Sequence, residues 1–165
     1  MDITWNHLTK VLNDFGEYFI ELARQNLTNN NSNASNNLYN SFEKIIEVGE
    51  DYFSVKISLE DYWKYLESGR RPGKYPPPQA IRNWIELKPV QPTPGLNGKT
   101  PTVEQLTFLI SRKIATEGTQ AQPFFEPAKE EAIRYFEEKI DQAIDEDVSD
   151  YILEIVEKGL KDALT

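Results

Sequence analysis

Hydrophobic residues recur every three or four positions at the start of the chain, which is the spacing of one face of a helix. The pattern predicts an amphipathic helix over residues 3–27, in which Gly16 costs about 1 kcal/mol relative to alanine. Eight of the fifteen residues from Asn26 to Asn40 are asparagine, a residue that favours turns over regular backbone pairing. We therefore predict a mobile loop over residues 26–40, with a short turn of helix near residues 37–41.

The next segment alternates hydrophobic and polar residues, as strands do when one face lies in the core. Residues 42–48 and 52–59 are separated by Gly49-Glu50-Asp51, so they predict an antiparallel β-hairpin. The inward-facing residues of the second strand are then Phe53, Val55, Ile57 and Leu59. Ser58 and Asp61 have the spacing of a capping box, which predicts a short helix over residues 60–68.

Proline-rich segments link the elements that follow. Pro78 suits the first turn of a helix. Thr102 and Gln105 form a second capping box, and the helix that they open is expected to end at Gly118.

The last helical region opens after Pro123 and carries hydrophobic residues at helical spacing. The pattern leaves open whether it is one long helix or two helices broken near residues 145–147. Taken together, the elements predict an α+β fold, in which a small antiparallel β-hairpin sheet is packed by a long N-terminal helix and by C-terminal helices.

Charge is distributed unevenly along the 165 residues. The net charge is −9, and residues 126–162 contribute −8 of it, with 13 acidic and 5 basic side chains. Residues 64–88 have the opposite character, because six basic residues face only Glu67 and Glu86, a local net charge of +4. The strongly acidic total argues against general nucleic-acid binding. A basic middle and an acidic end could instead meet between subunits.

Few side chains suggest catalysis or ligand binding. The chain has no cysteine and one histidine, His7, so a disulfide and a cysteine metal site are excluded, and a Ser-His dyad would have to use His7 as its base. Paired carboxylates such as those of residues 145–147 are read as the solvated face of a helix. We expect no catalytic residue, no metal and no cofactor.

No apolar stretch approaches the roughly 20 residues of a membrane span, and the start of the chain lacks the basic residues of a secretory signal. We therefore expect a soluble cytoplasmic product.

The basic segment also carries aromatic residues, which allows two interpretations. Arg70, Arg71 and Lys74 could bind phosphate while nearby aromatic rings stack on bases. Arginine, tryptophan and tyrosine are also enriched in protein interfaces, and we favour this interpretation. The candidate subunit or partner interface comprises Tyr62, Trp63, Tyr65, Arg70, Arg71, Lys74, Tyr75, Trp84, Phe124 and Phe125.

Two motifs carry a resemblance to a known family. The first is Tyr62-Trp63-x-Tyr65-Leu66-Glu67-x-Gly69-Arg70, followed by a proline-rich segment and Ile81-x-x-Trp84-Ile85. The second is Ile114-Ala115-Thr116-Glu117-Gly118-Thr119, followed by Pro123-Phe124-Phe125. The order of these motifs resembles that of the tail-completion, or head–tail joining, proteins of tailed bacteriophages. The resemblance covers about residues 3–140. The polar asparagine-rich loop and residues 142–165 depart from the family pattern.

The resemblance implies a structural virion protein without catalytic activity. Copies of it, about six or twelve, would form a ring in the neck between the portal or adaptor and the tail, with heterologous contacts between neighbours. Double-stranded DNA would pass through without specific binding, and the protein would be made in the bacterial host cytoplasm with no membrane partner. Residues 1–141 would form the tail-completion-like domain and residues 142–165 an acidic helical extension. The alternative is a small DNA-binding or packaging-associated module that uses the Arg70-Arg71-Lys74 loop.

Overall fold

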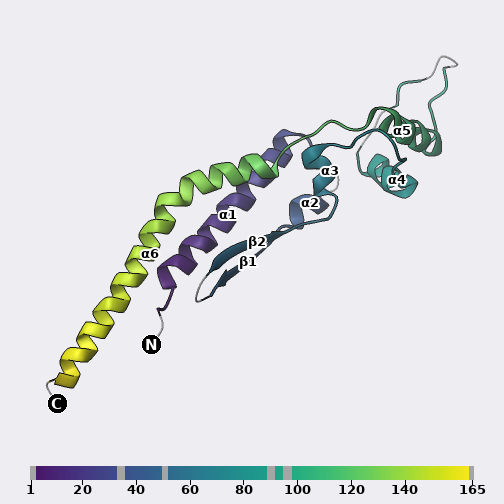
Figure 1. Ribbon diagram of the computed structural model, residues 1–165. Coiled ribbons are helices and arrows are strands. Elements are labelled where there is room, and N and C mark those ends of the chain that lie inside the picture. The colour runs from purple at the N-terminus through teal and green to yellow at the C-terminus, as the bar shows by residue number, and fades with distance from the viewer. Residues whose placement is uncertain (1–2, 33–35, 50–51, 89–91, 95–97, 164–165) are drawn as a thin grey trace. The chain divides into compact units, whose positions relative to one another are not determined.

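The computed structural model describes residues 3–32, 36–49, 52–88, 92–94 and 98–163. It confirms the α+β prediction, because it contains both helices and one antiparallel two-stranded sheet (Figure 1). The elements are α1 (Asn6–Asn29), α2 (Asn37–Asn40), β1 (Glu43–Val48), β2 (Phe53–Ser58), α3 (Trp63–Ser68), α4 (Pro78–Leu87), α5 (Val103–Glu117) and α6 (Phe125–Ala163).

The chain divides into two compact units, which are treated separately. The hairpin unit comprises Met1–Ala23, Phe42–Ser58 and Pro127–Thr165, and so contains most of α1, both strands and nearly all of α6. The helical unit comprises Arg24–Ser41 and Leu59–Glu126, with α2 to α5.

In the hairpin unit, α1 and α6 pack through aromatic rings. The ring of Phe15 meets that of Phe136 edge-on at 5.7 Å between centroids, and Tyr18 stacks on Tyr135 at 4.9 Å. Such pairs stabilise a contact by about 1 kcal/mol beyond the area that they bury. The predicted stripe of α1 forms the core of this unit, since Leu8, Leu12 and Phe19 are buried.

The hairpin packs on α1 at Gly16. In the register of the sheet, Lys44 pairs with Ile57 and Ile46 with Val55, so these four side chains share one face. A Cβ at Gly16 would lie 3.1 Å from Cδ of Lys44 and 3.4 Å from Cγ1 of Val55, so glycine permits a close approach of helix and hairpin. Val55 and Ile57 of the predicted inward face therefore lie toward α1, whereas Phe53, also predicted to face inward, is 46% exposed, and Leu59 lies beyond the end of β2.

Lys44 ties the hairpin to α1 through polar contacts. Its Nζ donates to the carbonyl oxygen of Asn13 at 3.2 Å, to Oδ1 of Asn13 at 2.8 Å and to Oε1 of Glu17 at 2.8 Å. The hydrogen bond and charge of Lys44 lower the pKa of Glu17.

Local motifs were predicted with different success. The capping box of Thr102 and Gln105 is confirmed, with N–H to side-chain distances of 3.0 and 3.3 Å. The capping box of Ser58 and Asp61 is wrong, because α3 begins at Trp63 without a side-chain cap. The hydroxyl of Ser41 instead accepts the N–H of Glu60 at 3.1 Å, so a residue distant in sequence serves this turn.

Two expectations about loops and breaks are now resolved in part. α6 continues through residues 145–147 as one helix, and the predicted boundary between residues 141 and 142 falls inside it. α1 extends to Asn29, so the prediction of a loop is wrong for residues 26–29, and α2 provides the predicted helical turn. Residues 33–35 of the loop predicted to be mobile lie outside the described residues.

Candidate interaction surface

The two motifs that carry the family resemblance come together in the helical unit. Arg70 and Thr119 form an antiparallel bridge, in which each N–H donates to the other's carbonyl oxygen, at 3.0 and 2.8 Å. The N–H of Gln122 donates to Leu66 O and that of Gly73 to Ala115 O, both at 2.8 Å. We call these two joined segments, residues 66–73 and 115–122, the clasp.

Two glycines make this close approach possible. Gly69 and Gly118 have φ of 71° and 77°, in the left-handed region that side chains with a Cβ rarely adopt. A Cβ at Gly118 would lie 2.0 Å from the carbonyl oxygen of Arg70, and one at Gly69 would lie 2.5 Å from that of Thr119. Any larger residue would therefore force the clasp apart.

Glu67, on α3, holds the start of α6. Its carboxylate accepts the N–H groups of Phe124 at 2.8 Å, Phe125 at 2.9 Å and Glu126 at 3.0 Å. The first N–H groups of a helix generally lack an acceptor within the helix, and the helix dipole favours negative charge there. The ring of Trp63 stacks on Phe125 at 4.8 Å, so α3 contributes both a polar and an aromatic contact.

Side chains of asparagines that were predicted to lie in a loop form hydrogen bonds to the segment that precedes α6. Nδ2 of Asn26 donates to the carbonyl oxygen of Phe124 at 3.1 Å, and Nδ2 of Asn30 donates to that of Pro123 at 3.0 Å. The hydroxyl of Ser32 lies 2.6 Å from Oε1 of Gln122. The C-terminal end of α1 thus holds the segment that leads into α6.

The predicted interface residues divide by exposure. Phe124 is fully buried, so it packs the interior rather than forming surface, while Trp63 and Phe125 are half-buried and stacked on each other. Exposed side chains are those of Tyr62, Tyr65, Arg71, Lys74, Tyr75 and Trp84.

Arg70 differs from its neighbours because its side chain turns back on the chain. Its Nη2 donates to the carbonyl oxygen of Lys74 at 2.9 Å, and the guanidinium lies 5.8 Å from the ring centroid of Tyr65. At the other end of the basic segment, Nζ of Lys88 lies 5.6 Å from the ring of Trp84 and donates to Asn31 O at 2.9 Å.

In the hairpin unit, the prediction that the carboxylates of residues 145–147 lie on the solvated face of a helix is wrong for Asp147. Asp147 is only 2% exposed, and it accepts the N–H groups of Asn6 at 3.1 Å, His7 at 2.9 Å and Leu8 at 2.9 Å. These are the first three residues of α1. Its position four residues after the buried Ala143 is the one local sign that it faces inward.

His7 lies on the exposed side of this cap. Its Nδ1 is 3.2 Å from Oε2 of Glu146, and its Nε2 is 3.3 Å from Oδ2 of Asp150. The two carboxylates contact opposite sides of the ring, so they do not converge on one point. Among the residues that the structure describes, no three His, Cys, Asp or Glu side chains are placed to hold a metal ion.

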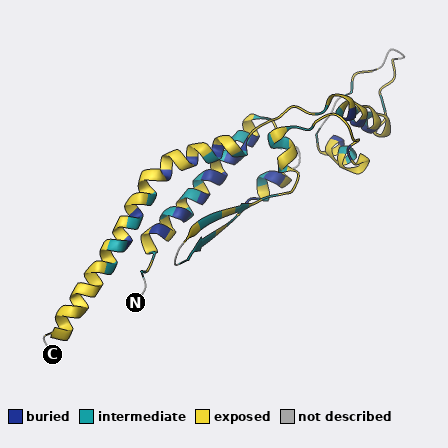
Figure 2. Cartoon of the chain, viewed as in Figure 1, coloured by how far each residue is buried: buried dark blue, intermediate teal, exposed yellow. Residues whose placement is uncertain are grey.

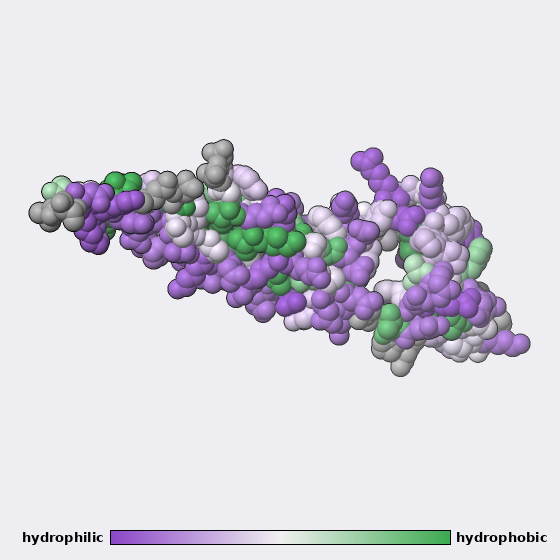
Figure 3. Space-filling model, turned by 90° about the horizontal axis from the view of Figure 1, so that it is seen from below, coloured by the Kyte–Doolittle hydropathy of each residue, from purple (hydrophilic) through white to green (hydrophobic). Residues whose placement is uncertain are grey.

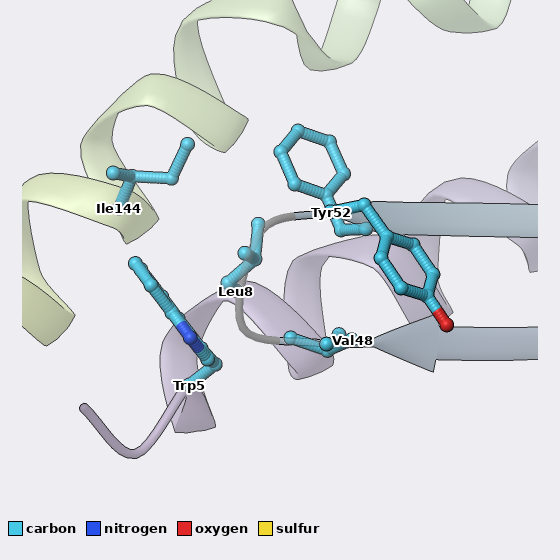
Figure 4. Close-up of a pocket in the computed structure, with 7 residues that line it drawn as sticks. Trp5, Leu8, Val48, Tyr52 and Ile144 are labelled. Atoms are coloured by element: carbon cyan, nitrogen blue, oxygen red, sulfur yellow. The ribbon is translucent and has the colours of Figure 1, made fainter. Parts of the chain in front are cut away.

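A pocket of about 430 Å³ lies beside the start of α1 in the hairpin unit. Trp5 and Leu8 come from the start of the chain, Val48 and Tyr52 from the end of the hairpin, and Ile144 from α6 (Figure 4). Gly49 and Phe53 complete the lining, which is mostly apolar. An apolar lining suits the burial of a hydrophobic group rather than acid–base chemistry.

Comparison with protein-family models, with curated proteins and with solved structures finds no match to this chain. No helix in the described part of the chain has the length and hydrophobicity to cross a membrane.

Proposed function

We propose that the chain is a structural subunit of the neck of a tailed bacteriophage. In this function, copies of the chain form a ring that joins the portal or adaptor to the tail, lets DNA pass and catalyses no reaction. The observation that carries the proposal is the clasp, because it joins the two separate motifs of the resemblance through paired backbone hydrogen bonds. Both motifs resemble those of one family, and they also pair with each other in the structure. This pairing supports the proposal that the chain shares the fold and the function of that family.

The surface around the clasp supports a role in protein contact. Tyr62, Tyr65 and Tyr75 are exposed, and Arg71 and Lys74 lie among them. Exposed tyrosine and arginine are enriched at the centres of protein interfaces. Arg71 lies within the clasp and the other four lie within a few residues of it, so paired backbone adjoins this surface and reduces the entropy lost on binding.

The DNA-binding alternative receives less support. It needs Arg70, Arg71 and Lys74 to reach phosphates, but the guanidinium of Arg70 is engaged by Lys74 O and by Tyr65. Of the three cations in this loop, Arg71 and Lys74 are exposed, and two cations on a chain of net charge −9 would neutralise few phosphates. A salt-sensitive mobility shift of duplex DNA at near-physiological ionic strength would favour this alternative.

The test of the proposed function is the composition of phage particles. Particles of the phage that encodes the chain are purified, and quantitative mass spectrometry measures the number of copies of the chain relative to the portal protein. A ratio near one or one-half is the expected result, since rings of about twelve or six subunits match portal symmetry or half of it. Absence of the chain from intact particles would overturn the structural role.

A charge-reversal variant tests the surface itself. Arg71→Glu with Lys74→Glu alters two exposed side chains and none of the backbone groups whose hydrogen bonds join the clasp, so the subunit should fold and its incorporation into particles should fall at least tenfold. Lys10→Glu, an exposed change on α1, is the matched control and should be incorporated normally. Normal incorporation of the double variant would show that this surface forms no contact.

A further inference from the structure

α6 carries an unbroken row of apolar residues at every fourth position. Residues spaced by four form a ridge along a helix, and such a ridge packs into the grooves of a neighbouring helix. The ridge consists of Ala128, Ala132, Phe136, Ile140, Ile144, Val148, Ile152, Val156 and Leu160.

The ridge passes from buried to exposed along the helix. Its first three residues are buried, and the next three are half-buried where Ile144 borders the pocket beside α1. Its last three, Ile152, Val156 and Leu160, are 54%, 51% and 61% exposed. Figure 2 shows the same change from blue to yellow along α6, and hydrophobic groups are visible in green over the last turns in Figure 3.

The exposed end of the ridge lies on a different side of α6 from the part that packs within the hairpin unit, because each four-residue step advances about 40° around the helix. Leu153 and Ile155 are also about half-exposed, so five large aliphatic residues lie open within nine positions. A monomeric protein rarely leaves such a patch uncovered, because each buried side chain of this size contributes about 2 kcal/mol. A partner is therefore expected to cover it.

Charge indicates what kind of partner fits. Residues 145–162 carry seven acidic and two basic side chains, a net charge of −5, so two copies of this segment would repel each other. The complementary surface within the same sequence is the basic segment of residues 64–88. There α4 exposes Trp84 by 39% and Leu87 by 52%, one turn apart, with Lys88 beside the tryptophan ring.

We propose that the exposed end of the α6 ridge packs against α4 of a second copy, with Trp84 and Leu87 facing Ile152, Val156 and Leu160. The contact is heterologous, so each copy offers one surface to each of two neighbours. The repetition of this contact around a closed ring rests on the proposed function. The contact itself does not depend on that function, because it forms between any two copies of the chain.

Introduced cysteines test the contact directly, because the chain has none of its own. Full-length Leu87→Cys is mixed with Ile152→Cys, Val156→Cys or Leu160→Cys, each copy bearing a different tag, under mild oxidation. At about 1 mM protein, a contact with a millimolar Kd is substantially occupied. We expect a mixed disulfide with at least one ridge variant, formed several-fold more slowly when the salt is raised from about 50 to 500 mM.

Glu154→Cys is the matched control. It lies two residues from both Ile152 and Val156, about 200° around the helix, and should cross-link at least tenfold less. Three results would overturn the proposal: no cross-link of Leu87→Cys to any ridge position, a ridge variant that cross-links chiefly to itself, or a Leu87→Cys, Val156→Cys double variant that closes only within one chain.

The outcomes separate this contact from the proposed function. If the chain is counted in phage particles but no mixed disulfide forms, the ring stands and this contact is wrong. If the disulfide forms but the chain is absent from particles, the contact stands and the neck function is wrong.

Discussion

Both units fix the start of a long helix with a carboxylate from a distant part of the chain. In the hairpin unit, Asp147 accepts three N–H groups at the start of α1, and its partners lie 139 to 141 residues away. In the helical unit, Glu67 does the same for α6, with partners 57 to 59 residues away. The arrangement is shared, but the surroundings are different.

The difference lies in what else holds each helix start. Asp147 is almost fully buried, and elsewhere in the same unit α6 packs on α1 through aromatic side chains. Glu67 is half-buried, and the paired backbone of the clasp lies beside it on the same segment. A unit held by side-chain contacts should depend most on its buried carboxylate, whereas a unit held by paired backbone should depend most on the glycines that permit the pairing.

The largest expected effect is that of Gly118→Ala. The added Cβ would lie 2.0 Å from the carbonyl oxygen of Arg70, so the clasp must open or shift. Together with the strain of a positive φ, we expect a loss of at least about 3 kcal/mol in the free energy of unfolding. Urea unfolding measures the loss, and amide exchange should locate it at Arg70 and Thr119.

Gly98→Ala is a matched control for that substitution. Gly98 has φ of 70°, close to that of Gly118, but a Cβ added there would meet no atom of the described structure within 4 Å. Its cost should be the conformational strain alone, about 1 kcal/mol. Equal losses for the two variants would mean that backbone pairing is not what sets the stability of the helical unit.

The second largest effect is expected for Asp147→Asn. The amide keeps the size of the carboxylate but offers one acceptor instead of two, and its NH₂ group would face the N–H donors of α1. We expect a loss of about 2 to 3 kcal/mol, because buried donors remain unsatisfied. Asp150→Asn, an exposed change one turn later, should cost less than about 0.5 kcal/mol. Exchange protection at Asn6, His7 and Leu8 should fall only in the first variant.

These two carboxylates mark the limit of what could be predicted from the sequence. Thr102 and Gln105 were identified because a capping box is local, with both partners within three residues. Asp147 and Glu67 perform a comparable role from far along the chain, so no local spacing reveals them. Ser58 and Asp61 matched the local pattern of a capping box but form no side-chain cap for α3. Instead, the hydroxyl of Ser41 accepts the N–H of Glu60 in the turn before this helix, a contact that depends on the tertiary fold.

The hairpin was predicted from the alternation of hydrophobic and polar residues, and the structure confirms it by pairing β1 with β2 in antiparallel orientation. The row of apolar residues on α6 was likewise visible as periodicity. Periodicity identifies the apolar side of a helix, but it does not say which part of that side a neighbour covers. For the same reason the candidate surface was predicted only in part: Tyr65 and Lys74 are exposed as expected, whereas Phe124 is buried.

Glu67→Gln should have a smaller effect than Asp147→Asn. The site is half-exposed, so water can replace part of the lost hydrogen bonding, and the clasp still holds the segment. We expect a loss of about 1 kcal/mol, the usual range for a helix N-terminal cap. Glu86→Gln, an exposed change on α4, is the control and should be neutral. A loss larger than that of Asp147→Asn would reverse the comparison between the two units.

The smallest effect concerns the ion pair that joins the hairpin to α1. Lys44 lowers the pKa of Glu17, so the charged form of Glu17 is stabilised in the folded protein. Its contribution to stability is present above the ordinary glutamate pKa of about 4.3 and is lost as the pH falls through the lower folded-state value. Glu17→Gln should therefore lower the Tm slightly at pH 7, and the difference from the unmodified protein should shrink below about pH 4.3 and vanish at lower pH. Asp14→Asn, an exposed change on the same helix, provides the control. A Tm difference for Glu17→Gln that stayed constant down to pH 2 would show that the side chain acts by packing rather than by charge.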